Sequence, residues 1–200
     1  MHFTTTITAL GFVLSAAAVP ASQSWIVDPA AATDAPAVPD SGNPVAADAN
    51  VAAGTTGDAN VRNYCDFPVY LYVCGQDPAS CTPEYTLAAK TGTYSEVFST
   101  PNNGRSIKMG TTSGEVAKPI LQFEYTNTGS GQVAYDLSEV NGNPFGPYGF
   151  FLTSNNNACF HEECPAPGTH DVCPWVFTTP TNGLVSDCPI ASSIGVTLCG

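Results

Sequence analysis

Residues 133–142 read Val-Ala-Tyr-Asp-Leu-Ser-Glu-Val-Asn-Gly, and this stretch decides the predicted fold. Apolar and polar side chains alternate through Val133–Ser138, which is the pattern of a strand with one buried face. The residues at 141–144, Asn-Gly-Asn-Pro, favour a turn directly after it. Asp136 stands between an aromatic residue and a leucine, so a half-buried strand would present its carboxylate on one face.

Other short runs of this kind recur along the chain, separated by turn signals rich in Gly, Pro and Asn. No stretch has the spacing of an amphipathic helix. Evenly spaced short strands with such turns are typical of an antiparallel sandwich or barrel. The predicted strands are Val69–Val73, Tyr94–Phe98, Ser106–Met109, Ile120–Thr126, Val133–Ser138, Tyr148–Thr153 and Ile194–Leu198.

The first part of the chain differs in composition from the rest. Residues 1–21 are predicted to be a secretory signal peptide, because Ile7–Val19 is apolar and small residues suited to cleavage follow. Residues 22–60 are rich in Ala, Pro and Asp, and we predict a disordered spacer or propeptide there. The folded domain is predicted at 61–200, where no apolar run approaches the roughly 20 residues of a membrane-spanning helix.

The charge balance narrows the possible partners. Asp and Glu total 17 and Lys and Arg total 5, which gives a formal net charge of −12. With no basic patch to neutralise phosphates, we expect no nucleic acid and no anionic membrane as a partner. Charged residues make up 11% of the chain and hydrophobic residues 43%, so the fold must rest on packing and covalent links. We expect an extracellular or cell-wall protein.

Eight cysteines all lie between Cys65 and Cys199. An even number behind a predicted signal peptide indicates disulfides, although spacing alone leaves roughly a hundred pairings open. In a reducing cell the alternative would be a zinc ion held by ligands among Cys159, His161, Cys164, His170 and Cys173. In a secreted chain we expect bridges, no structural metal and no cofactor, with weak binding of a metal by the two histidines as a minor alternative.

Three groups of residues together resemble the thaumatin-like proteins. Residues 61–65 and 68–70 are similar to the opening of that family, where Asn-x-Cys begins the first strand. Residues 135–142 are similar to its signature Tyr-Asp-Val-Ser-x-Val-Asp-Gly. The C-terminal part also fits, with Cys159-x4-Cys164, Cys173-Pro174, Cys188-Pro189 and Cys199. The short length and few cysteines resemble the fungal branch, the secreted antigenic thaumatin-like proteins described from yeast-phase antigens.

The resemblance implies an all-β fold, the thaumatin-like antiparallel β-sandwich stabilised by disulfides. Larger members carry further bridges in a second domain that is largely absent from this chain. The implied pairs are Cys65 with Cys199, Cys74 with Cys81, Cys159 with Cys188, and Cys164 with Cys173.

The resemblance also implies a cleft, which in plant members is lined by an Arg, a Glu and three Asp and is linked to β-1,3-glucan binding. The matching positions here are Glu124 for the Glu, Asp136, Asn141 and Trp175 for the three Asp, and either Arg105 or Lys108 for the Arg. At least two of the five groups have therefore lost their charge.

Two chemical uses of Glu124 and Asp136 remain open. Glycoside hydrolysis needs two carboxyl groups about 5 to 9 Å apart, one protonated and one ionised. The loss of charge at Asn141 and Trp175 leaves fewer neighbours to raise the pKa of the acid. By contrast, an exposed Trp beside a carboxylate suits the stacking of a sugar ring.

We therefore predict a secreted, non-catalytic, monomeric protein that binds β-1,3-glucan or another cell-wall polysaccharide through this reduced acidic groove. One alternative is a weak endo-β-1,3-glucanase that uses Glu124 and Asp136. The other is an antigen or effector that contacts host proteins and has no carbohydrate role.

Overall fold

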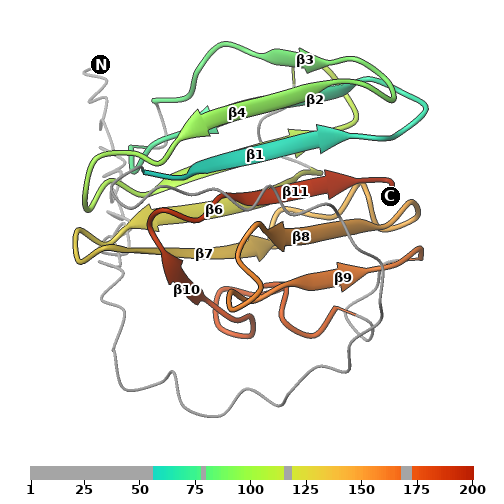
Figure 1. The fold of residues 1–200 in the computed structure, drawn as a ribbon. Coiled ribbons are helices and arrows are strands. Elements are labelled where there is room, and N and C mark those ends of the chain that lie inside the picture. Colours follow the sequence, from blue (N-terminus) through green and yellow to red (C-terminus); the bar gives the residue numbers. More distant parts are fainter. Residues whose placement is uncertain (1–55, 78–79, 115–118, 168–172) are drawn as a thin grey trace, which may run out of the picture. The chain divides into compact units, whose positions relative to one another are not determined.

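The computed structural model describes residues 56–77, 80–114, 119–167 and 173–200. These residues form eleven strands, without a helix, in two sheets (Figure 1), which confirms the predicted all-β sandwich. The strands are β1 (Asp58–Asn63), β2 (Val69–Cys74), β3 (Tyr85–Leu87), β4 (Thr93–Val97), β5 (Arg105–Gly110), β6 (Leu121–Asn127), β7 (Gln132–Ser138), β8 (Phe150–Ser154), β9 (Glu162–Cys164), β10 (Ser186–Pro189) and β11 (Ile194–Leu198).

The first sheet has the order β4-β1-β11-β8-β9. Its pairs are antiparallel except β1 with β11, which run parallel with Val61 opposite Val196. The first and last strands of the domain therefore lie side by side in its middle (Figure 1). The disulfide between Cys65 and Cys199 joins the chain just beyond the ends of these two strands.

The second sheet has the order β10-β7-β6-β5-β2-β3, and all its pairs are antiparallel. Register aligns Ile107, Phe123 and Leu137 across β5, β6 and β7, and all three side chains are buried. The neighbouring row aligns Ser106 with Glu124 and Glu124 with Asp136. Because successive residues of a strand point to opposite faces, this second row lies on the outer face of the sheet.

The apolar faces of the two sheets pack against each other to form one core. Complete burial of a large side chain of this kind contributes about 1.5–3 kcal/mol to stability. The second sheet supplies Leu71, Ile107, Met109, Phe123 and Tyr135, and the first sheet supplies Val61, Phe150, Leu152, Ile194 and Val196.

Four disulfides complete the domain, and no cysteine of the described residues is free. Cys65 and Cys199 are 134 residues apart, so in the chain-entropy model their bond restrains the unfolded chain by about 5 kcal/mol. The pairs are the ones that the resemblance implies, Cys65–Cys199, Cys74–Cys81, Cys159–Cys188 and Cys164–Cys173.

The seven predicted strands correspond to β2, β4 to β8 and β11, with small shifts at their ends. The sequence did not indicate β3, β9 and β10, which are short. The resemblance implied a first strand that begins at Asn63, whereas β1 ends there. β1 begins at Asp58, ahead of the predicted domain start at 61, and its polar sequence is held by strands on both sides. The predicted signal peptide and most of the predicted spacer lie outside the described residues. Within the described part of the chain, no helix has the length and apolarity needed to cross a membrane.

Candidate functional site

Alternation along three adjacent strands gathers polar side chains on the outer face of the second sheet. Residues at even positions of β5, β6 and β7 point outward, whereas those at odd positions enter the core. We call this group the polar patch; it consists of Ser106, Lys108, Gln122, Glu124, Asp136 and Ser138. The sequence predicted three of them, Lys108, Glu124 and Asp136. The same alternation would have indicated the other three.

Glu124 and Asp136 are direct cross-strand partners at the centre of the patch. Cβ atoms of such partners lie about 4.5–5.5 Å apart, and like charges in this arrangement repel each other. Both side chains are partly exposed. The register of β6 and β7 therefore brings these two carboxyl groups together, on the open face of a sheet.

Hydrogen bonds organise the rest of the patch around Gln122. Lys108 Nζ donates to Gln122 Oε1 at 2.5 Å, and Ser106 Oγ donates to the same oxygen at 3.4 Å. Gln122 Nε2 in turn donates to Ser138 Oγ at 3.3 Å. Asp136 differs from these side chains, because its Oδ1 is buried and has no hydrogen-bond partner among the described residues.

The charges of the patch perturb one another. Burial raises the pKa of Asp136 well above its usual range, and the neighbouring Glu124 carboxylate raises it further. Burial also raises the pKa of Glu124, while Lys108 and the Ser106 hydroxyl partly lower it. Burial lowers the pKa of Lys108, and Glu124 opposes this change. The positive charge of Lys108 can therefore neutralise only one of the two carboxylates.

Arg105 belongs to a different cluster on the core side of β5. It lies opposite Tyr125 in the register, and its Nη2 donates to Glu96 Oε2 at 3.0 Å. Tyr94 and Tyr125 each donate their hydroxyl to Glu96 at 3.0 Å. We call these four residues the Glu96 cluster. Of the two cations between which the sequence left the choice open, the structure places Lys108 in the polar patch and Arg105 in the Glu96 cluster.

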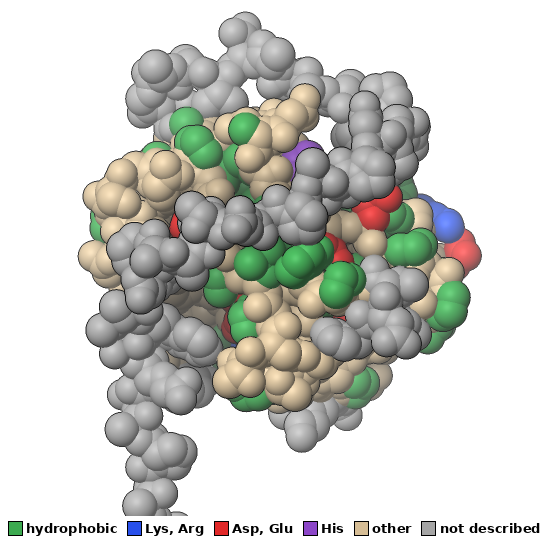
Figure 2. Space-filling view, turned by 90° about the horizontal axis from the view of Figure 1, so that it is seen from below, with side chains coloured by type: hydrophobic (Ala, Val, Ile, Leu, Met, Phe, Trp, Pro, Cys, Tyr) green, Lys and Arg blue, Asp and Glu red, His purple; other side chains and the backbone are tan. Residues whose placement is uncertain are grey.

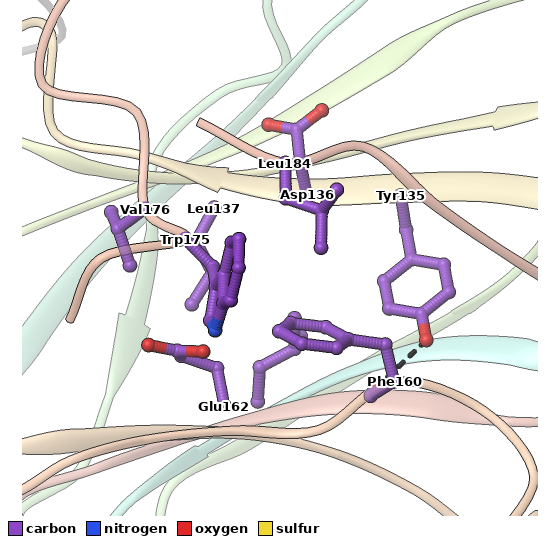
Figure 3. Close-up of a pocket in the computed structure, with 9 residues that line it drawn as sticks. Tyr135, Asp136, Leu137, Phe160, Glu162, Trp175, Val176 and Leu184 are labelled. Carbon is purple, nitrogen blue, oxygen red and sulfur yellow. Dashed lines mark hydrogen bonds between the residues drawn. The ribbon is translucent and has the colours of Figure 1, made fainter. Parts of the chain in front are cut away.

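Trp175 also lies apart from the two carboxylates. Figure 3 shows its ring beside Glu162 and Phe160 in a cavity between the sheets, while the Asp136 carboxylate points away from that cavity. The Trp175 and Phe160 rings meet edge to face with centroids 6.2 Å apart. The expected stacking platform beside Asp136 is therefore not formed by Trp175, because strand alternation turns Asp136 to the other side of the sheet.

Asn141 lies in the turn that follows β7. Its main-chain oxygen accepts a hydrogen bond from the Ile120 N–H at 3.3 Å, and Gly142 beside it has a positive φ of 106°. A Cβ at Gly142 would lie 2.9 Å from Pro119 Cβ, so glycine is required there for both reasons. These contacts give the end of the motif a structural role in closing the turn.

Glu162 is a buried acid, which the sequence indicated only as a further ligand in the zinc alternative. It lies on β9 opposite Leu152, its side chain lines the cavity of Figure 3, and burial raises its pKa to about 7. Glu162 also lies near Cys164 and Cys173, but these two sulfurs bond to each other and offer no thiolate to a metal. Of the residues considered for the zinc alternative, His170 lies outside the described residues.

Figure 2 shows one face of the domain, on which hydrophobic and uncharged side chains predominate, a few acidic side chains lie among them, and basic side chains are visible only at one edge. In the whole sequence, Asp and Glu total 17 and Lys and Arg total 5.

The fold and the comparisons define the class first: the two disulfide-stabilised sheets form a thaumatin-like β-sandwich. A solved structure with this arrangement, the protein elicitor MoHrip2 from Magnaporthe oryzae, is 25% identical and has a TM-score of 0.60, covering 72% of this chain and 99% of that one. The thaumatin-like xylanase inhibitor TLXI is 15% identical with a TM-score of 0.47, covering 71% and 99%.

The family follows from the sequence matches. The family model described as Bys1, Blastomyces yeast-phase-specific protein, matches residues 46–200. An antigenic thaumatin-like protein of Arthroderma benhamiae is 32% identical over 153 residues, which are 76% of this chain and 75% of that protein. The chain therefore belongs to the fungal yeast-phase-specific family of antigenic thaumatin-like proteins, as the resemblance of residues 135–142 and the cysteine pattern predicted.

Proposed function

We propose that this chain is a secreted, non-catalytic protein that binds β-1,3-glucan or a related cell-wall polysaccharide through the polar patch. The observation that carries the proposal is the buried, unpartnered Oδ1 of Asp136 beside Glu124 on a partly exposed face. Buried polar atoms of native proteins nearly always have a partner, so an acceptor left without one next to an accessible surface favours a donor from outside.

The chemistry of the patch suits a sugar polymer. Its carboxyl, amide, ammonium and hydroxyl groups can accept hydrogen bonds from sugar hydroxyls and donate to them. Two tyrosines of β2 extend the same face, with Tyr72 opposite Lys108 and Tyr70 opposite Gly110. Tyr70 is partly exposed and supplies an aromatic surface of the kind first expected from Trp175.

Two features favour binding without hydrolysis. The two carboxyl groups lie side by side on one sheet face, whereas a glycosidase places its acid and its nucleophile or base on two sides of the scissile bond. Two similar proteins are named for recognition, one as an antigenic thaumatin-like protein and one as a protein elicitor.

Secretion is supported by chemistry as well as by kinship. The domain relies on four disulfides, which persist in oxidising compartments. The apolar, small-residue-rich start of the sequence suits a signal peptide.

The likeness to an elicitor favours a second candidate, an effector-type protein that a host receptor recognises. Such a protein would need no polysaccharide ligand, and its polar patch would be incidental. The two candidates differ in whether the isolated protein is retained by glucan.

A pull-down on particulate β-1,3-glucan tests the proposal. The variant Glu124→Ala/Asp136→Ala removes both carboxyl groups, and we expect it to lose at least about tenfold in retention, which corresponds to about 1.4 kcal/mol. The control Asp66→Ala/Glu163→Ala removes two exposed acids elsewhere and should bind like the unaltered protein. Equal retention of both variants would refute the assignment of the patch. Release of reducing sugar from laminarin by the unaltered protein would instead support the glucanase alternative.

A further inference from the structure

We propose that Glu124 and Asp136 share one proton in the free protein, and that loss of this proton releases the bound polysaccharide. The inference rests on the proposed function and adds its regulation. It follows from the arrangement of charges around the pair, taken strand by strand.

The pair itself sets up a conflict between like charges. The register places Glu124 of β6 directly opposite Asp136 of β7, and both side chains lie on the same face. The surroundings of the two acids differ: the Lys108 charge and the Ser106 hydroxyl favour the ionised form of Glu124, whereas Asp136 Oδ1 receives no donor within the described part of the chain. A single proton held between the two carboxyl groups removes the repulsion, as in other closely spaced carboxyl pairs.

Few other charged groups face the pair. β5 contributes Lys108, whose Nζ is held by Gln122, and β10 contributes the exposed Asp187, which lies opposite Ala134 beside Asp136. β2 contributes Tyr72, whose hydroxyl is bound to Glu84 at 2.5 Å. Residues 173–185, which lead into β10, contain no Asp, Glu, Lys, Arg or His.

The charge of the site therefore depends on the shared proton. With the proton, one carboxylate and the Lys108 ammonium cancel, and the centre of the patch is neutral. Without it, two carboxylates face one ammonium, and an uncompensated negative charge remains. A neutral polysaccharide that covers the patch removes water from it, and burial of an uncompensated charge is unfavourable. Binding should therefore be tight while the pair is protonated and weaken as the proton passes to the solvent at higher pH.

Linkage gives a second consequence. If the protonated pair binds the polymer more tightly, the polymer must in turn raise the affinity of the pair for the proton. Binding near the midpoint of the titration should therefore take up protons from the buffer. Calorimetry in buffers of different ionisation enthalpy measures this uptake directly.

The first test needs no ligand. In the full-length protein with ¹³C-labelled carboxyl groups, the NMR signals of Glu124 and Asp136 should titrate together in two steps, with one step well above the usual range of carboxylic acids. The variant Asp136→Asn should move the Glu124 titration toward its usual range, because a neutral amide removes the competing charge. Independent titration of the two residues in the usual range would overturn the proposal, whatever the protein binds.

The second test measures the release. Retention of the unaltered protein on particulate β-1,3-glucan should fall at least tenfold between about pH 5 and about pH 8. Asp136→Asn, which keeps the shape of the side chain and fixes it in a neutral form, should make retention equal at the two pH values, and Asp66→Asn should leave the fall unchanged. Proton-controlled release would be overturned if retention of Asp136→Asn also fell between the two pH values. It would equally be overturned if retention of the unaltered protein did not fall. Absence of retention at both pH values would refute the proposed function, while the NMR titration would still decide whether the proton is shared.

Discussion

Two polar clusters lie on opposite faces of the same strand, β5, and they treat their carboxylates in opposite ways. On the core side, Glu96 receives three donors, from Arg105, Tyr94 and Tyr125, and so joins β4 of one sheet to β5 and β6 of the other. On the outer side, Asp136 has a carboxyl neighbour and an oxygen that receives no donor from the residues that the structure describes. The first arrangement is complete in itself and links the sheets, whereas the second is incomplete without a ligand or a proton.

This difference gives the Glu96 cluster a role in stability and the Glu124–Asp136 pair a role in binding. A satisfied carboxylate stabilises the fold because its desolvation is offset by charge-assisted hydrogen bonds. An unsatisfied pair lowers stability and persists where a binding role requires it. Substitutions in the two clusters should therefore have opposite effects on stability and on binding.

The largest effect on stability is expected for Glu96→Ala. This change leaves the Arg105 guanidinium, 24% exposed, without its partner and removes the acceptor of two tyrosine hydroxyls. We expect the free energy of unfolding to fall by about 2–4 kcal/mol, measured by chemical denaturation. Glucan retention per folded molecule should not change. If the free energy of unfolding falls by less than about 0.5 kcal/mol, the Glu96 cluster does not have the stabilising role that we assign to it.

Glu162 belongs to neither cluster, so it tests how burial alone changes the pKa of an acid and the stability of the fold. Its pKa is raised to about 7 in the folded protein, against about 4.3 in an unfolded chain. A raised pKa contributes stability below the unfolded value, and this contribution is lost as the pH rises through the folded value. Glu162→Gln should therefore match the unaltered protein near pH 4 and be more stable by about 2–4 kcal/mol near pH 8.

Thermal unfolding across this pH range measures the Glu162 effect. The exposed neighbour Glu163 provides the control, since Glu163→Gln should leave the pH profile unaltered. A stabilisation of Glu162→Gln that is the same at all pH values would contradict a cause in ionisation.

The smallest effects are expected from single hydroxyl groups, one in each cluster. Tyr125→Phe removes one donor from Glu96 and should cost about 1–2 kcal/mol, because that hydrogen bond is to a charged group. Ser106→Ala, on the outer face of β5, removes a weak 3.4 Å contact with Gln122 and should cost less than about 0.5 kcal/mol. The denaturation midpoints of the two variants compare how much each cluster contributes to stability. A larger loss of stability in Ser106→Ala than in Tyr125→Phe would contradict the stabilising role of the Glu96 cluster.

The sequence predicted the centre of the fold well, because alternation and turns are local signals. Val133–Ser138 and Ile194–Leu198 became strands as expected, whereas β9 and β10 depend on pairing with distant strands that their own short sequences do not reveal. Glu124 and Asp136 were predicted as site residues, but their direct cross-strand pairing follows only from the register of β6 and β7. The position of Arg105 required the register of β5, since a shift of one residue exchanges the two faces of a strand.

Trp175 shows a second reason why the site was only partly predictable. A match of position in a family motif fixes the place of a residue in the chain, but its direction depends on the loop that carries it. That loop turns the Trp175 ring into the cavity beside Phe160 and Glu162, away from the carboxylate pair (Figure 3). The motif also did not indicate two other features of the site, the Gln122 amide in the polar patch and the neighbouring tyrosines of β2, Tyr70 and Tyr72.

The most direct test of the central claim compares glucan retention of Glu124→Ala/Asp136→Ala with that of Glu96→Ala, each corrected for its folded fraction. We predict that the double variant loses at least about tenfold in retention while its unfolding free energy stays within about 1 kcal/mol of the unaltered protein. Glu96→Ala should show the reverse, with reduced stability and full retention. The polar patch is not the binding site that we propose if the double variant binds as well as the unaltered protein. The same conclusion follows if the loss of retention is accounted for by a loss of folded protein.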